Sequence, residues 1–184
     1  MAIDERRRQD ELLRSCLQDT LAAYHAVKRT RRLLDAEAGP EHSEPVSFDI
    51  YDQYMKSIND EQLKFEKLKM LADIIDDPRL PRTPPWPDAR EKDQNKAPLV
   101  AMFSKVEHSL NELVDEYQDS RHEVKQAGSI PLAQLTQAQL FVTSRGFRTA
   151  IAHPKDCVVK LLQTALLEPV LLPAFRAENG DGQA

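Results

Sequence analysis

The segment 51–75, YDQYMKSINDEQLKFEKLKMLADII, decides the fold, because its apolar residues recur every three or four positions. The segment 103–124, FSKVEHSLNELVDEYQDSRHEV, repeats this spacing. Such spacing places the apolar side chains on one side of an α-helix, where they can pack against a neighbouring helix. Glycine occurs only five times in the chain, and the β-branched runs typical of strands are scarce. The sequence therefore predicts an all-α fold.

Glycine and proline residues set the expected ends of the helices. Gly39-Pro40 follows the first helical pattern, because glycine suits a left-handed cap and proline cannot continue a helix. Asp77-Pro78 ends the second pattern, since the residue before a proline is disfavoured in helical geometry. Ser47 is the expected N-cap of the second helix. The expected elements are a helical hairpin over 1–76 with helices at about 4–38 and 47–76, a proline-rich linker over 77–97, a long helix over 98–127, a small helical unit over 129–176 and a disordered tail over 177–184.

The proline-rich linker leaves the direction of the third helix open. An extended proline-rich chain reaches about 3.1 Å per residue, so the linker can span roughly 60 Å. The second helix is about 45 Å long, which is less than this reach. The third helix can therefore run parallel or antiparallel to the second. We expect an elongated bundle or coiled coil of three helices of about thirty residues, followed by a smaller C-terminal helical unit.

Local signals divide that C-terminal unit into short helices. Thr136 and Gln139 have the spacing of a capping box, and Leu135 and Leu140 stand at the positions of a hydrophobic staple. A later segment is apolar on most sides, which is typical of a buried helix. The expected helices run over about 137–144 and from 154 or 155 to 167.

The sequence lacks the residue patterns of a recognisable enzyme. Glycine-rich phosphate loops and the nucleophile elbow are absent. The His122-Glu123 pair begins like a zinc-protease helix, but Gln126 stands where the second histidine is needed. The histidines show no metal-ligand spacing. We therefore expect a non-catalytic protein with no metal and no cofactor.

Composition limits the partners and the compartment. The formal net charge is −5, which opposes binding of nucleic acid over the whole surface. No run approaches the roughly twenty apolar residues of a membrane span, and the N-terminus has no apolar stretch of the signal-peptide type. Cys16 and Cys157 are far apart and follow no disulfide pattern. These features favour an intracellular protein of the nucleus or cytoplasm.

Three segments are candidates for binding a partner. Thr20 and Arg31 interrupt the apolar seam of the first helix, which makes it the poorest seam and the one most suited to a partner. The proline-rich linker either enters an aromatic groove on another protein or packs back on the chain's own helices. A leucine-rich C-terminal segment either closes the bundle or enters a partner's groove. The candidate residues are Leu13, Leu17, Tyr24 and Val27 in the seam, Pro84, Pro85 and Trp86 in the linker, and Leu171, Leu172 and Phe175 near the C-terminus.

Two charged clusters offer further surfaces. The basic patch near the end of the first helix is either a solvated helix end, an anion-binding patch or a nuclear-import signal. The acidic face of the third helix is expected to be solvated or to contact a basic partner. The basic patch comprises Lys28, Arg29, Arg31 and Arg32, and the acidic face comprises Asp115, Glu116 and Asp119.

The expected function is that of a non-catalytic helical scaffold or interaction subunit of an intracellular multiprotein complex. Its partners would be other helical proteins that form coiled-coil or bundle contacts. Self-association is a further expectation, because polar residues in long seams tend to select a particular partner. The alternative is a regulatory factor associated with nucleic acid or chromatin through the basic end of the first helix. The basic patch favours this alternative, and the acidic net charge opposes it.

Overall fold

Helices account for most of the structure. The computed structural model describes residues 2–82 and 96–178, with the backbone alone for residues 2 and 168–178. It is 86% helical, and its described part holds a single small two-stranded sheet, so the expected all-α fold is confirmed. The long helices are α1 (Ala2–Ala38), α2 (Phe48–Ile74), α3 (Pro98–Ala127) and α6 (His153–Glu178). The shorter elements are strands β1 (Pro45–Ser47) and β2 (Ser129–Pro131), helices α4 (Thr136–Val142) and α5 (Ser144–Phe147), a π-helix (Arg148–Ala152) and two 3₁₀ turns (Pro40–His42 and Leu132–Gln134).

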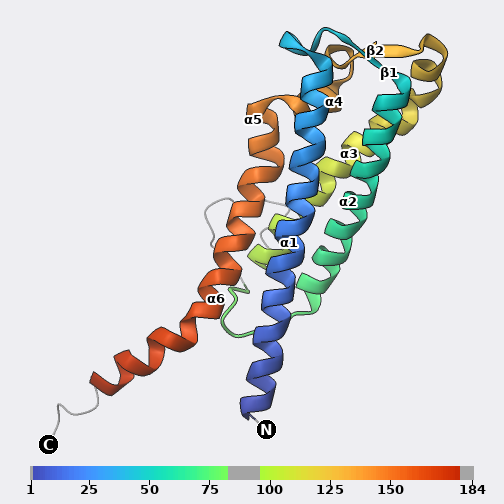
Figure 1. Ribbon diagram of the computed structural model, residues 1–184. Helices are drawn as coiled ribbons and strands as arrows, with labels where there is room; N and C mark the ends of the chain where they lie inside the picture. Colours follow the sequence, from blue (N-terminus) through green and yellow to red (C-terminus); the bar gives the residue numbers. More distant parts are fainter. Residues whose placement is uncertain (1, 83–95, 179–184) are drawn as a thin grey trace, which may run out of the picture.

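The four long helices lie side by side and alternate in direction (Figure 1). α2 and α6 each pack against both α1 and α3. Strand β1 pairs antiparallel with β2, so that Pro45 lies opposite Pro131 and Ser47 lies opposite Ser129. This pairing places the start of α2 beside the end of α3. α3 therefore runs antiparallel to α2, and the sequence had left this direction open.

The small sheet also replaces an expected helix cap. Gly128 ends α3 in the left-handed conformation, with φ of 78°, and its N–H donates to the carbonyl oxygen of Val124 at 2.9 Å. Ser47 occupies the N-cap position of α2, but its side chain makes no capping hydrogen bond. Instead the backbone of Ser47 pairs with β2, and the N–H of Phe48 donates to the carbonyl oxygen of Gly128 at 2.9 Å. The contact with β2 and Gly128 thus satisfies a backbone N–H at the start of α2, a role that we expected of the Ser47 hydroxyl.

The C-terminal unit is larger than the sequence predicted. We expected its last helix to end at residue 167, but α6 continues through two prolines to Glu178. Its first half buries Val158, Leu162 and Ala165 in the core. Burial of an apolar side stabilises a helix more than local propensity does. We expected three long helices followed by a small unit. The structure has four long helices instead, because α6 packs along both α1 and α3.

The first residues of the expected linker over 77–97 are anchored on α1. The buried carboxylate of Asp77 accepts hydrogen bonds from two guanidinium nitrogens of Arg79, at 2.9 and 2.7 Å. Arg79 also donates to Asp10 of α1 at 2.6 Å. Leu80, which follows Arg79 in the sequence, is also buried. Residues 77–82 are non-helical, as a linker requires, but they pack against α1 instead of extending away from it, and residues 83–95 lie outside the described part of the chain.

The core follows the apolar sides of α2 and α3. Leu68 on α2 and Leu110 and Leu113 on α3 are buried, as the helical spacing predicts. Lys64 and Lys67, on the polar side of α2, are exposed. The amphipathic pattern that decides the fold is therefore satisfied within the chain.

Candidate interaction surface

The apolar seam of α1 packs inside the protein. Leu13 and Val27 are fully buried and Tyr24 is nearly so, while Leu17 is half-buried against the same core. Thr20 is buried too, and its hydroxyl donates to the carbonyl oxygen of Cys16 at 2.7 Å. This bond satisfies the polar group that had made the seam look poor. The prediction that these seam residues face a partner is therefore corrected, because α2 and α6 cover them.

The basic patch of α1 is divided between different roles. The guanidinium of Arg31 donates two hydrogen bonds, at 3.1 and 2.7 Å, to the carbonyl oxygen of Val142, at the end of α4. It also lies 5.2 Å from the ring centre of Phe147. Arg29 and Arg32 are exposed, whereas Lys28 is half-buried, with its amine 5.9 Å from the ring centre of Tyr24. The prediction of one free basic surface is thus wrong for Arg31, which holds α4 against α1.

The remaining partner-binding candidates are not placed by the structure. Pro84, Pro85 and Trp86 lie outside the described residues. Leu171, Leu172 and Phe175 belong to the part of α6 for which only the backbone is described. Their proposed contacts with partners stay predictions.

One residue of the expected acidic face has a structural role. The carboxylate of Glu116 accepts hydrogen bonds from the backbone N–H groups of Gln137 and Ala138, at 2.9 and 2.8 Å. It thereby caps α4 from a neighbouring helix. The capping box expected at Thr136 does not form, since no side chain of the flanking residues caps this helix. Asp115 and Asp119 are exposed, as expected of a solvated face.

An apolar groove lies between α3 and the residues 137–151 that follow it. Its volume is about 390 Å³. Its lining includes Ser109 and Glu112 on α3, and Leu140, Phe141, Phe147 and Ile151 on the facing segment. Residues 149–151 of the facing wall belong to the π-helix, and a π-helical turn often occurs at a functional site. We call this hollow the α3–α4 groove.

Leu140 is the exposed apolar residue of this groove. Its side chain is 51% exposed, whereas Leu135, its expected staple partner, is buried. The expected staple thus leaves about half of the Leu140 side chain exposed. α4 turns Ala138 and Phe141 towards the core, so that Gln139 and Leu140 point away from it. Sequence analysis missed this exposed leucine because it assigned the side chain a local partner.

Close packing fixes the wall that carries Leu140. A Cβ atom at Gly146 would lie 2.1 Å from the carbonyl oxygen of Leu140, so glycine is required at this close approach. The hydroxyl of Thr143 accepts a hydrogen bond from the N–H of Gly146 at 3.2 Å. The rings of Phe141 and Phe147 meet edge to face, with 5.8 Å between their centres. The groove therefore has a rigid wall, held also by Arg31 from α1.

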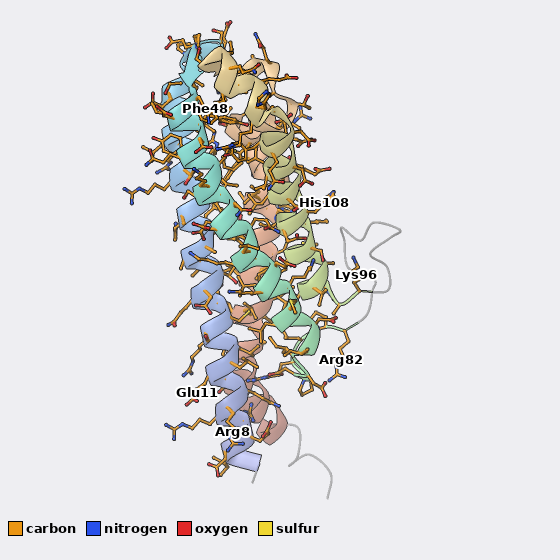
Figure 2. The ribbon with its side chains drawn as sticks, turned by 90° about the vertical axis from the view of Figure 1, so that its right-hand side faces the viewer. Arg8, Glu11, Phe48, Arg82, Lys96 and His108 are labelled. Carbon is orange, nitrogen blue, oxygen red and sulfur yellow. The ribbon has the colours of Figure 1, made fainter. Side chains whose placement is uncertain are left out.

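The two ends of the α3–α4 groove differ in charge. Towards the start of α3, the groove continues into a mixed polar hollow of about 490 Å³ whose lining includes Lys69, Lys96, Lys105 and Glu107, with Lys69 paired to Glu107 at 3.2 Å. Figure 2 shows Lys96 and His108 along this outer side of the molecule. Towards the end of α3, a shallow acidic hollow shares Glu112 and Gln137 with the groove. Its carboxylates belong to Glu112, Asp115, Glu116, Asp119 and Glu123.

A buried polar network joins α2 to α3 away from the groove. Asp52 of α2 accepts hydrogen bonds from the hydroxyl of Tyr117 and, at 3.1 Å, from Nε of Arg121. Lys56 donates to its other carboxylate oxygen at 2.5 Å. The hydrogen bond from Lys56, and next the one from Tyr117, lowers the pKa of Asp52 from its ordinary 3.8 to about 2. The charged carboxylate therefore stabilises the folded state.

Acid should remove this contribution of Asp52. A lowered folded-state pKa gives stability that is present above the unfolded pKa and is lost as the pH falls towards 2. Asp52→Asn should therefore lower the free energy of unfolding by about 1–2 kcal/mol at pH 7, since Lys56 is largely exposed and its interaction is screened by solvent. The difference from wild type should shrink as the pH approaches 2, as urea unfolding at several pH values would measure.

Lys56→Met provides the matched control for this prediction. It removes the largest cause of the lowered pKa and should reproduce part of the same pH dependence. An Asp52→Asn difference that is equal at pH 7 and pH 2.5 would contradict the assigned role of the carboxylate.

The described residues bring no three His, Cys, Asp or Glu side chains together as a metal site. Within the same residues, no helix is long and apolar enough to cross a membrane. Comparisons of the chain with protein-family models, with curated proteins and with solved structures gave no match. Among the described residues, the α3–α4 groove combines a hollow with an exposed apolar side chain.

Proposed function

We propose that the chain is a non-catalytic helical interaction subunit of an intracellular multiprotein complex, and that it binds its partner through the α3–α4 groove. The observation that carries this proposal is an apolar groove with an exposed leucine on a protein whose long helices already fill their own seams. Exposed apolar surface of this kind marks sites of protein interaction. Binding at the side of a finished bundle differs from our first expectation, in which a partner completed the seam of α1.

A second apolar surface supports the expected self-association. Leu63, Met70 and Ile74 are 45%, 63% and 76% exposed, and their spacing of seven and four residues places them on one side of α2. They form a row on the outer surface of that helix. A row of this kind suits contact with another helix, and sedimentation of the purified chain would test whether the partner is a second copy. The nucleic-acid alternative has less support, because Arg31 is engaged with α4.

Affinity capture with a groove variant tests the proposed function. The tagged full chain and its Leu140→Glu variant would each be used to retain proteins from cells, with quantitative mass spectrometry as the readout. Because Leu140 is exposed, a charge there should leave the fold intact and remove most of the specific partner. Leu12→Glu, at an exposed apolar position on α1 outside both proposed surfaces, is the matched control and should leave that partner bound.

Two results would count against the proposal. One is that no protein is retained above the level of a tag-only sample. The other is that the captured set is the same for wild type and both variants.

A further inference from the structure

We infer that the α3–α4 groove binds an amphipathic α-helix of a partner protein, about four turns long, with basic residues at its N-terminal end. This inference rests on the proposed function and specifies the partner of the same groove. It follows from the apolar lining, from the acidic charge that only one end carries and from the length of the surface between the two ends.

The apolar part of the groove matches one side of a helix. α3 forms one wall, and α4, α5 and the π-helix form the other, which leaves a channel along α3. Leu140 stands exposed at the wall beside Arg145, and Phe141, Phe147 and Ile151, each no more than 5% exposed, line the groove behind it. A helix that places apolar residues every three or four positions fits such a channel, as in other helix-in-groove complexes.

The charge at the two ends determines which charged residues the bound helix needs and in which direction it runs. At the end near the C-terminus of α3, Asp115, Asp119 and Glu123 are exposed, and the described residues that line this part include no Lys or Arg. These carboxylates complement basic side chains and also the positive N-terminal end of a helix dipole. At the other end, three lysines of the polar hollow face Glu107 and Glu112, and Lys69 pairs with Glu107, so this end lacks the acidic excess and better accommodates the negative C-terminal end of the bound helix. The bound helix therefore runs antiparallel to α3.

The length of the charged surface sets the length of the partner helix. Lys105 and Asp119 are fourteen residues apart on α3, which corresponds to about 21 Å along a helix. A helix of about fourteen residues has roughly four turns and spans both ends of the groove. Three or four of its residues would face the apolar lining.

Labelled peptides test this inference with the full chain. The probe is a fourteen-residue helical peptide with leucines at helical spacing and lysines in its first two turns. One comparison peptide has glutamates in place of the lysines, and another has serines in place of the leucines. Fluorescence anisotropy should show that the probe binds at least about tenfold more tightly than either comparison peptide, since it alone matches both the charge and the apolar lining.

Variants of the chain locate the binding site. Leu140→Glu should weaken binding of the probe at least about tenfold. The double variant Asp115→Lys and Asp119→Lys should weaken the probe and improve binding of the glutamate peptide, because it reverses the charge of that end. Leu12→Glu, at an exposed apolar position on α1, is the matched control and should bind the probe as wild type does. Circular dichroism of each variant would confirm that it is folded.

Three outcomes would overturn the inference. They are equal binding of the lysine and glutamate peptides, equal binding of the leucine and serine peptides, and binding of the probe that Leu140→Glu does not change. A captured cellular partner that stays bound to Leu140→Glu would preserve an interaction function while refuting this groove as its site.

Discussion

Replacing Leu110 by alanine should lower the free energy of unfolding by about 3–5 kcal/mol. Leu110 lies on α3 with none of its side chain exposed, and it belongs to the continuous core of the bundle. The substitution removes apolar contacts and leaves a cavity that close-packed neighbours cannot fill without strain. The loss is a large share of the roughly 5–15 kcal/mol by which domains of this kind are stable. Urea unfolding followed by circular dichroism would measure it.

Leu140→Ala is the control for this prediction, because it makes the same chemical change at an exposed site. It should cost less than about 1 kcal/mol. Similar losses for the two variants would show that α3 does not pack through Leu110. A loss from Leu110→Ala that appears only in the presence of a bound partner would instead show that this side of α3 faces the partner.

Replacing Asp77 by alanine should cost about 2–4 kcal/mol, which is the second largest effect that we expect. Asp77 is buried, and its carboxylate binds the mostly buried guanidinium of Arg79 through two hydrogen bonds. The hydrogen bond from Arg79 is the largest cause of the lowered pKa of Asp77. Without Asp77, the Arg79 charge stays buried with the carboxylate of Asp10 as its remaining partner. Thermal unfolding of the variant would report the loss.

A double-mutant cycle separates the ion pair from simple loss of packing. Asp77→Ala combined with Arg79→Met should cost less than the sum of the two single changes, because the Asp77–Arg79 interaction is lost only once, while the loss of Asp10's partner is common to Arg79→Met and the double variant. Strictly additive costs would contradict a direct interaction between the two side chains. The result matters for the fold, because this cluster fixes the chain leaving α2 to the side of α1.

The helical content and most helix ends could be predicted from local sequence. The repeating apolar residues of α2 and α3, with Leu68, Leu110 and Leu113 among them, predict both the helices and the buried side of each. Gly39 and Gly128 lie just beyond the ends of α1 and α3, where the sequence predicted helix termination. These features depend on the periodicity of the helix and on backbone preferences, which act over a few residues.

The end of α6 could not be predicted in the same way. Burial of residues such as Leu162 between α1 and α3 explains the packing of the first half of α6, whereas nothing in the described side chains explains its continuation past the prolines at 169 and 173. The same limitation applies to the seam of α1. An apolar stripe has the same spacing whether its own chain or a partner covers it, so Leu13 and Val27 could not be assigned to the core from the sequence.

The sequence by itself determined an all-α chain with amphipathic helices, together with the residues that face away from water on α2 and α3. The tertiary structure alone decided the antiparallel direction of α3, the fourth long helix and the candidate groove. It also decided the roles of individual charges, because Arg31 and Glu116 each stabilise α4 from a distant position in the chain. A charged side chain carries no local signal of the backbone group that it will meet. The exposure of Leu140 likewise depends on how α4 packs against the bundle, which is a property of contacts between distant segments.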